Sequence, residues 1–86
     1  MNIWEIVEDN HIDHWVIAST SEEAIKAVKV AVACDDDAHF MRYKMPSDSE
    51  LTIRMNDAGQ TIITHTVYEW LLIHNYQAQY LACSEF

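Results

Sequence analysis

Apolar and polar residues alternate with a period of two at the amino end of the chain. The stretch NIWEIVED (residues 2–9) divides its side chains into two sets, with Ile3, Glu5 and Val7 in one and Trp4, Ile6 and Glu8 in the other. Such alternation is typical of a β-strand. The stretch HWVIAS (residues 14–19) is rich in aromatic and β-branched residues and predicts a second strand. We therefore expect a hairpin, with NHID (residues 10–13) as its turn.

Helical spacing replaces this alternation in the segment STSEEAIKAVKVAVAC (residues 19–34). Thr20 stands three residues before Glu23, which is the capping-box spacing, and Ser19 and Glu22 offer the same pairing one residue earlier. Five apolar residues recur at helical spacing and predict one buried face: Ala24, Ile25, Val28, Ala31 and Val32. We expect the helix to end before the aspartates that follow it, because the helix dipole disfavours negative charge at a carboxyl end.

The second half of the chain returns to alternation. HFMRYKM (residues 39–45) and LTIRM (residues 51–55) predict two strands that pair with each other, and TIITH (residues 61–65) predicts a third after the turn NDAGQ. Thr66 is expected to cap a short helix, VYEWLLIHN, and YLAC is expected to form a short edge strand. The order β-β-α-β-β-β-α-(β) predicts one α+β domain over residues 1–86, with both helices packed on one face of a mainly antiparallel sheet.

Net charge narrows the range of partners. The chain has 5 basic and 14 acidic residues, which gives a formal charge of −9. Proteins that bind the nucleic-acid backbone directly need cations to displace its counterions, so we expect no direct binding to DNA, RNA or anionic membranes. Three of the cations, Arg42, Lys44 and Arg54, are expected on one face of the sheet. The acidic balance favours a basic protein partner, although binding of cations or mere solubility would explain it as well.

Neither a signal peptide nor a membrane span is expected, because Asn2 to Glu8 is neither basic nor continuously apolar and no apolar run approaches ~20 residues. This predicts a cytoplasmic location, which would be the host cytoplasm for a phage-encoded protein. Cys34 and Cys83 are far apart in the sequence and are expected to be reduced thiols, with a single disulfide as the alternative.

Three consecutive aspartates, Asp35, Asp36 and Asp37, follow the first helix in the stretch ACDDDAHF. If this segment is extended, Asp35, Asp37 and His39 project to one side and form a candidate metal cradle. A hard cation requires more oxygen ligands than this set supplies, and the segment lacks the glycine and distal glutamate of a calcium-binding loop. We therefore favour a solvated loop, with an acidic protein-binding surface as the alternative, and predict no metal site.

Other chemistries find little support in the sequence. His11 and His14 form an H-x-x-H motif around Asp13, but zinc would require further ligands from elsewhere, so a surface turn is expected. No nucleophile elbow is present. Gly59 is the only glycine, which argues against a loop that cradles phosphate. We predict that the protein is not an enzyme and binds no cofactor.

The acidic residues are therefore the candidate binding residues, and they fall into three groups. The groups surround the first hairpin, the exit of the first helix and the loop before residue 51: Glu5, Glu8, Asp9 and Asp13; Asp35, Asp36 and Asp37; Asp48 and Glu50. Spread evenly over the surface, fourteen carboxylates would be roughly three times sparser than the phosphates of B-DNA. Mimicry of nucleic acid therefore requires that they crowd onto one side.

An opening strand with a tryptophan, the segment WVIASTSEEAI leading into a capped helix, and the closing segments YEWLLIHN and YLACSEF span most of the chain. In this pattern the sequence resembles small phage- or prophage-encoded proteins, several of which act as anti-CRISPR or anti-restriction factors. The resemblance implies an acidic surface that is presented to the nucleic-acid channel of a target protein.

Taken together, these patterns predict a small acidic, non-enzymatic protein that binds a basic protein surface. Its most specific form would be a phage counter-defence inhibitor of the anti-CRISPR type, acting as a nucleic-acid mimic. The alternative is a structural or homo-oligomeric accessory protein, such as a homodimer, whose acidity serves solubility only. One contiguous acidic face would favour the inhibitor, whereas scattered acids would favour the accessory protein.

Overall fold

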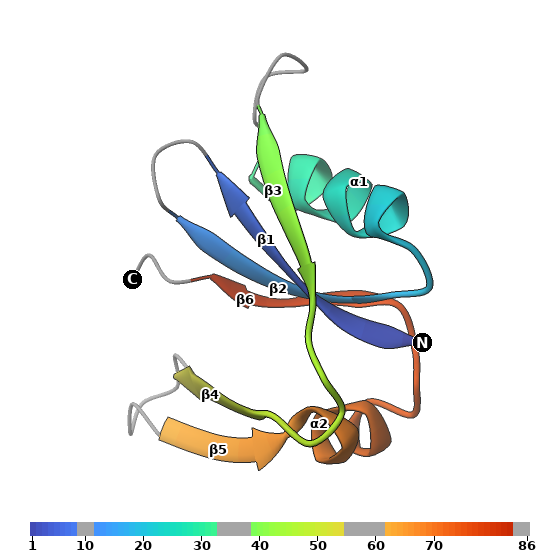
Figure 1. The fold of residues 1–86 in the computed structure, drawn as a ribbon, viewed down its shortest axis with the longest axis vertical. Coiled ribbons are helices and arrows are strands. Elements are labelled where there is room, and N and C mark those ends of the chain that lie inside the picture. Colours follow the sequence, from blue (N-terminus) through green and yellow to red (C-terminus); the bar gives the residue numbers. More distant parts are fainter. Residues whose placement is uncertain (9–11, 33–38, 55–61, 84–86) are drawn as a thin grey trace.

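The computed structural model of the chain describes residues 1–8, 12–32, 39–54 and 62–83, and the side chains of Val32 and Arg54 lie outside that description. The elements follow the order β1 (Asn2–Glu8), β2 (Asp13–Ala18), α1 (Ser21–Val32), β3 (Phe40–Lys44), β4 (Glu50–Arg54), β5 (Ile62–Thr66), α2 (Val67–Ile73) and β6 (Gln79–Cys83) (Figure 1). The α+β class and the predicted order of elements are confirmed.

The strands form two antiparallel sheets. One has four strands in the order β3-β1-β2-β6, and the other contains β4 and β5 alone. The predicted pairing of residues 39–45 with residues 51–55 is therefore wrong, because β3 pairs with β1 instead. The segment between β3 and β4 carries the chain out of the first sheet. Leu51 and Ile53 can then bury their side chains against Ile3, which extension of the same sheet would not allow.

The four-stranded sheet is covered on both faces (Figure 1). On one face, α1 contributes Ala24 and Val28 to a core with Ile6, Val16 and Ala18. On the other face, β4, β5 and α2 form a second layer whose core residues pack on the sheet: Leu51, Ile53, Val67, Trp70 and Leu71 against Ile3 and Ile17. The prediction that both helices share one face is wrong. Strands β1 and β2 carry apolar side chains on both faces, and each face requires a separate cover.

Helix α1 begins as the capping box predicts. The backbone N–H of Glu23 donates to Oγ1 of Thr20 at 3.2 Å, and the N–H of Ala24 donates to the Thr20 carbonyl oxygen. Ala24 and Val28 are buried as expected, but Ala31 is exposed. Ala31 lies beside Tyr80 of the edge strand β6, where a groove remains open. Ala31 therefore departs from the predicted buried face, whereas the side chain of Val32 lies outside the described part of the chain.

Helix α2 follows β5 without an intervening loop, because Thr66 ends the strand and caps the helix. Its hydroxyl accepts from the N–H of Glu69, and the Glu69 carboxylate accepts from the N–H of Thr66 at 2.8 Å. The N–H of Val67 donates to the carbonyl oxygen of Ser49 at 2.8 Å, which fixes the helix to the chain before β4. Inside this layer, the indole N–H of Trp70 donates to the carbonyl oxygen of Leu51 at 2.8 Å.

Strand β6 contains a register irregularity that changes which of its side chains share a face. His14 faces Cys83 across the ladder, whereas Val16 faces Tyr80, and the shift falls between Trp15 and Val16. In a regular strand, residues 80 and 83 would point to opposite faces. The extra residue of a β-bulge cancels that alternation. Tyr80 and Cys83 therefore lie on the face that carries His14.

Candidate functional site

Most cations with described side chains lie on the α1 side of the sheet. Lys26 and Lys29 belong to α1, and Arg42 of β3 lies opposite Ile6, on the face that α1 covers. A guanidinium nitrogen of Arg42 is 3.3 Å from a carboxylate oxygen of Glu22 at the start of α1. Positive and negative charges are therefore mixed on this side of the molecule.

The opposite side of the molecule has a different distribution of charged side chains. Five acids lie on the exposed part of that sheet face or in the second layer: Glu5, Asp13, Asp48, Glu50 and Glu69. Among the side chains described there, none belongs to lysine or arginine. Lys44 stands at the margin, at the end of β3, where it borders a hollow together with Asp48. We call the exposed part of this sheet face, together with the second layer, the acidic side. The four-stranded sheet thus separates this side from the α1 side, where the described charges are mixed.

Part of the acidic side is an open area of sheet surface. Glu5 lies in β1 between Trp15 of β2 and Tyr43 of β3, its two cross-strand neighbours. Met41 is 56% exposed and Tyr43 is 48% exposed, so the second layer leaves this area uncovered. Burial raises the pKa of Glu5, and the negative charge of Asp13 raises it further. We call Glu5, Asp13, Trp15, Met41 and Tyr43 the open sheet face.

The remaining acids of this side lie around the start of α2. Glu50 is the first residue of β4 and pairs with Thr66, and Asp48 is exposed in the loop before it. Glu69 serves the helix itself: hydrogen bonds with the backbone and side chain of Thr66 lower its pKa. Tyr68 of the first turn of α2 is 53% exposed and donates its backbone N–H to the carbonyl oxygen of Ser47.

Glu8 and His14 do not have the positions expected of surface residues. The side chain of His14 is 1% exposed, and its Nε2 is 2.8 Å from a carboxylate oxygen of Glu8. The other ring nitrogen, Nδ1, is 2.7 Å from the hydroxyl of Tyr80. The expectation that H-x-x-H forms a surface turn is therefore wrong for His14. This residue belongs to β2, and its side chain points into the core. The carboxylate of Glu8 is held inside the fold on the α1 side.

Several predicted residues lie outside the described part of the chain. These are His11, Cys34 and four of the candidate acids: Asp9, Asp35, Asp36 and Asp37. His39 is described and exposed. Within the described residues, no group of three or more histidine, cysteine or acidic side chains has an arrangement that could hold a metal ion. The same residues include no helix that is long and apolar enough to cross a membrane.

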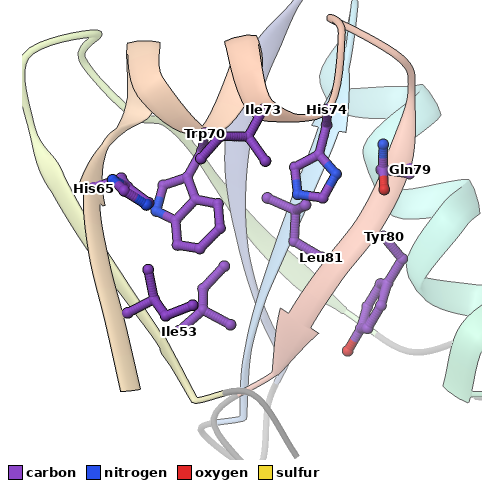
Figure 2. A pocket seen from close by; sticks show the side chains of 9 residues that line it. Ile53, His65, Trp70, Ile73, His74, Gln79, Tyr80 and Leu81 are labelled. Carbon is purple, nitrogen blue, oxygen red and sulfur yellow. The ribbon is translucent and has the colours of Figure 1, made fainter. Parts of the chain in front are cut away.

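A cavity of about 250 Å³ lies between the second layer and β6 (Figure 2). Its walls are aliphatic side chains and the indole of Trp70, with an imidazole on either side of that indole. The ring of His65 meets the ring of Trp70 edge-on, with 4.9 Å between the ring centroids. The ring of His74 is stacked on that of Trp70, with 6.1 Å between the centroids. Since the two imidazoles pack against the indole, we interpret this cavity as a consequence of aromatic packing.

The sequence identified Glu5, Asp13, Asp48 and Glu50 as candidates, and the structure places them on one side of the sheet. It did not identify Tyr43 and Met41 as their neighbours, because that contact depends on the pairing of β3 with β1. Comparison with known proteins adds no further constraint: no family model, no curated protein and no solved structure matches this chain.

Proposed function

We propose that this protein binds a basic surface of a partner protein through its acidic side. The observation that carries the proposal is the division of charge by the four-stranded sheet, with five described acids opposite α1 and Lys44 only at their margin. Evenly mixed charges would serve solubility equally well on every face. A one-sided field, in contrast, attracts and orients a partner of opposite charge.

The open sheet face supplies the contacts that charge alone does not. Exposed aromatic residues near the centre of an interface contribute much of the binding energy, and Tyr43 with Met41 lies directly beside Glu5. The raised pKa of Glu5 indicates that its ionised form is disfavoured by burial and by Asp13. A lysine or arginine from a partner would compensate both effects, so the free protein gains electrostatically from that contact.

The most specific form of this proposal is a phage counter-defence inhibitor whose target carries a basic nucleic-acid channel. That form rests on the resemblance of the sequence, whereas the basic partner rests on the charge distribution. The competing proposal is an accessory protein or homodimer whose acidity serves solubility only. It predicts that the position of a carboxylate is unimportant and that only the total charge matters.

Two charge-matched double variants separate these proposals. Glu5→Gln with Asp13→Asn removes two charges from the open sheet face, and Glu22→Gln with Glu23→Gln removes two from the start of α1. A partner captured with the wild-type chain from a host lysate would be immobilised, and binding would be measured by surface plasmon resonance at two salt concentrations. We expect the first variant to reduce the association rate and to flatten its salt dependence, and the second to change little.

A third variant, Tyr43→Ala, tests the apolar part of the surface. We expect it to raise the dissociation rate while leaving the salt dependence of association unchanged. If both double variants have the same effect on binding, then only net charge matters, and the solubility role is correct. If neither changes binding, the acidic side is not the interface.

A further inference from the structure

The cavity between the second layer and β6 is larger than an ordinary packing defect. Its volume is about 250 Å³. Protein interiors contain few voids larger than a water molecule, whereas an apolar cavity of about 150 Å³ is sufficient to bind benzene. The space that the aromatic packing around Trp70 leaves open is therefore large enough for a molecule with one ring or two fused rings.

Fixed contacts hold one wall of this cavity in place. Trp70 is buried in the core of the second layer, and its indole N–H donates to the carbonyl oxygen of Leu51 at 2.8 Å. The ring of His65 meets the indole edge-on. The wall therefore exists before any ligand arrives, and a preformed site loses little conformational entropy on binding.

Other walls of the cavity consist of apolar side chains that remain in partial contact with water. Ile63 of β5 and Leu81 of β6 pack against the core of the second layer but are only partly buried. Ile73 at the end of α2 is 53% exposed and borders the same space (Figure 2). A ligand in the cavity would remove apolar surface of these side chains from water, which is a main source of affinity in small-molecule sites.

The lining favours a ligand without charge. Its described residues include two imidazoles but no carboxylate, ammonium or guanidinium group that could pair with an ion. The carboxylate of Glu69 lies outside the lining, 3.9 Å from Nδ1 of His65, and accepts a hydrogen bond from the N–H of Thr66. An anion would meet the negative field of Glu69 and of the whole chain, and any unpaired ion is costly to bury between apolar walls.

The imidazole of His74 is the polar group that a ligand can use. Its ring stacks on that of Trp70, with an angle of 19° between the ring planes, and Figure 2 shows it pointing from α2 toward β6. Within the described part of the chain, neither ring nitrogen of His74 forms a hydrogen bond. A neutral imidazole presents one donor and one acceptor nitrogen. A ligand with one hydroxyl or N–H group can therefore pair with His74 while its ring lies between the apolar walls.

We propose that this cavity binds a small neutral aromatic molecule with one hydrogen-bond donor, such as a phenol or an indole. The donor pairs with a ring nitrogen of His74, and the aromatic ring packs against Trp70, since aromatic rings attract each other in edge-on and offset arrangements. None of the five acids of the acidic side lines the cavity. The inference is therefore independent of the proposed partner binding.

The test is a titration of the protein with indole, followed by amide NMR spectra. We expect saturable shifts in the signals of residues 70–74 and 79–81, with a dissociation constant on the order of 0.1–1 mM, as for other ligands of this size. Benzofuran has the same shape but an oxygen in place of the N–H group. It should bind roughly fivefold more weakly, because it lacks the hydrogen bond with His74.

Three variants of α2 locate the site. Ile73→Trp places a larger side chain at the cavity and should weaken indole binding roughly tenfold or more. Leu72→Trp is the matched control at the preceding position, which is 47% exposed and outside the lining, and should leave binding unchanged. His74→Phe retains a ring beside Trp70 but has no ring nitrogen, so indole and benzofuran should bind to it equally.

Each of these measurements can overturn the proposal. Indole that causes no saturable shifts at several times the expected dissociation constant would do so, as would wild-type affinity in Ile73→Trp. Equal affinities of the wild type for indole and benzofuran would remove the role of His74, and this comparison needs no variant to fold. Benzoate is the anionic control, and binding of benzoate as tight as that of indole would contradict the choice of a neutral ligand.

Discussion

Two carboxylates of the same strand, Glu5 and Glu8, have different roles because they point to opposite faces of the sheet. Glu8 accepts a hydrogen bond from a buried imidazole on the α1 side. Glu5 lies on the open sheet face, where burial and the charge of Asp13 raise its pKa. In a strand, a shift of one position moves a side chain from one environment to the other. The role of each acid therefore depends on whether its position in β1 points to the α1 side or to the open sheet face.

Glu5→Gln should stabilise the free protein at neutral pH. A carboxyl whose pKa is higher in the folded state favours folding at pH values below its unfolded pKa, and this contribution is lost as the pH rises through the folded pKa. Because Glu5 is partly exposed, solvent reduces the effect, and we expect a gain of about 0.5 kcal/mol, or roughly 2–4 °C in Tm. The gain should disappear below about pH 4, where Glu5 is protonated in both states.

Thermal unfolding of the variant and the wild type at both pH values measures this difference. Glu22→Gln is the control, since Glu22 is exposed and pairs with Arg42. The control should show no gain at neutral pH. A Glu5→Gln protein that is less stable than the wild type at neutral pH would contradict the described environment of Glu5.

At the scale of elements, local pattern was sufficient to predict each strand and helix but not how they pair. Alternation predicted β1, β3 and β4, aromatic and β-branched content predicted β2, and the Thr66 cap predicted the start of α2. The partner of β3 depends instead on contacts between residues far apart in the chain, as does the placement of the helices on opposite faces. The bulge in β6 leaves no mark in the sequence, because it depends on the strand beside it.

The orientation of α1 gives a sharp test of one element. Val28 is fully buried between the helix and the sheet, whereas Val30, two residues later, is 79% exposed. We expect Val28→Ala to cost about 2 kcal/mol, from lost apolar burial and the space left behind. Val30→Ala makes the same chemical change and should be neutral or slightly stabilising, since alanine favours helices more than valine.

Chemical denaturation of the two variants would measure these free energies of unfolding. The difference between them, rather than either value, is the informative quantity, because the substitution is the same. Equal losses of stability would mean that α1 presents another face to the sheet.

At the scale of the whole molecule, the charge distribution predicts what the protein avoids as well as what it binds. The described cations Lys26, Lys29 and Arg42 share the α1 side with Glu8, Glu22 and Glu23, so they form no strongly basic surface. We expect no shift of duplex DNA or RNA in a gel at moderate salt, because backbone binding requires several uncompensated cations. Salt-sensitive retardation of bare DNA would contradict the assignment of a basic partner.

The shared residue Thr66 has a consequence for how the molecule opens. Strand β5 passes into α2 without a flexible joint, and the capping box and the Val67–Ser49 bond tie that junction to β4. The second layer is therefore a single cooperative unit, whose amide protons should exchange with solvent at a common opening free energy. Thr66→Ala, which should cost about 1 kcal/mol, would speed exchange across β4, β5 and α2 alike and leave the β1–β2 pair protected. Transient opening of this unit would expose Ile3 and Ile17, which are fully buried in the closed fold, as an apolar surface of the kind that promotes aggregation.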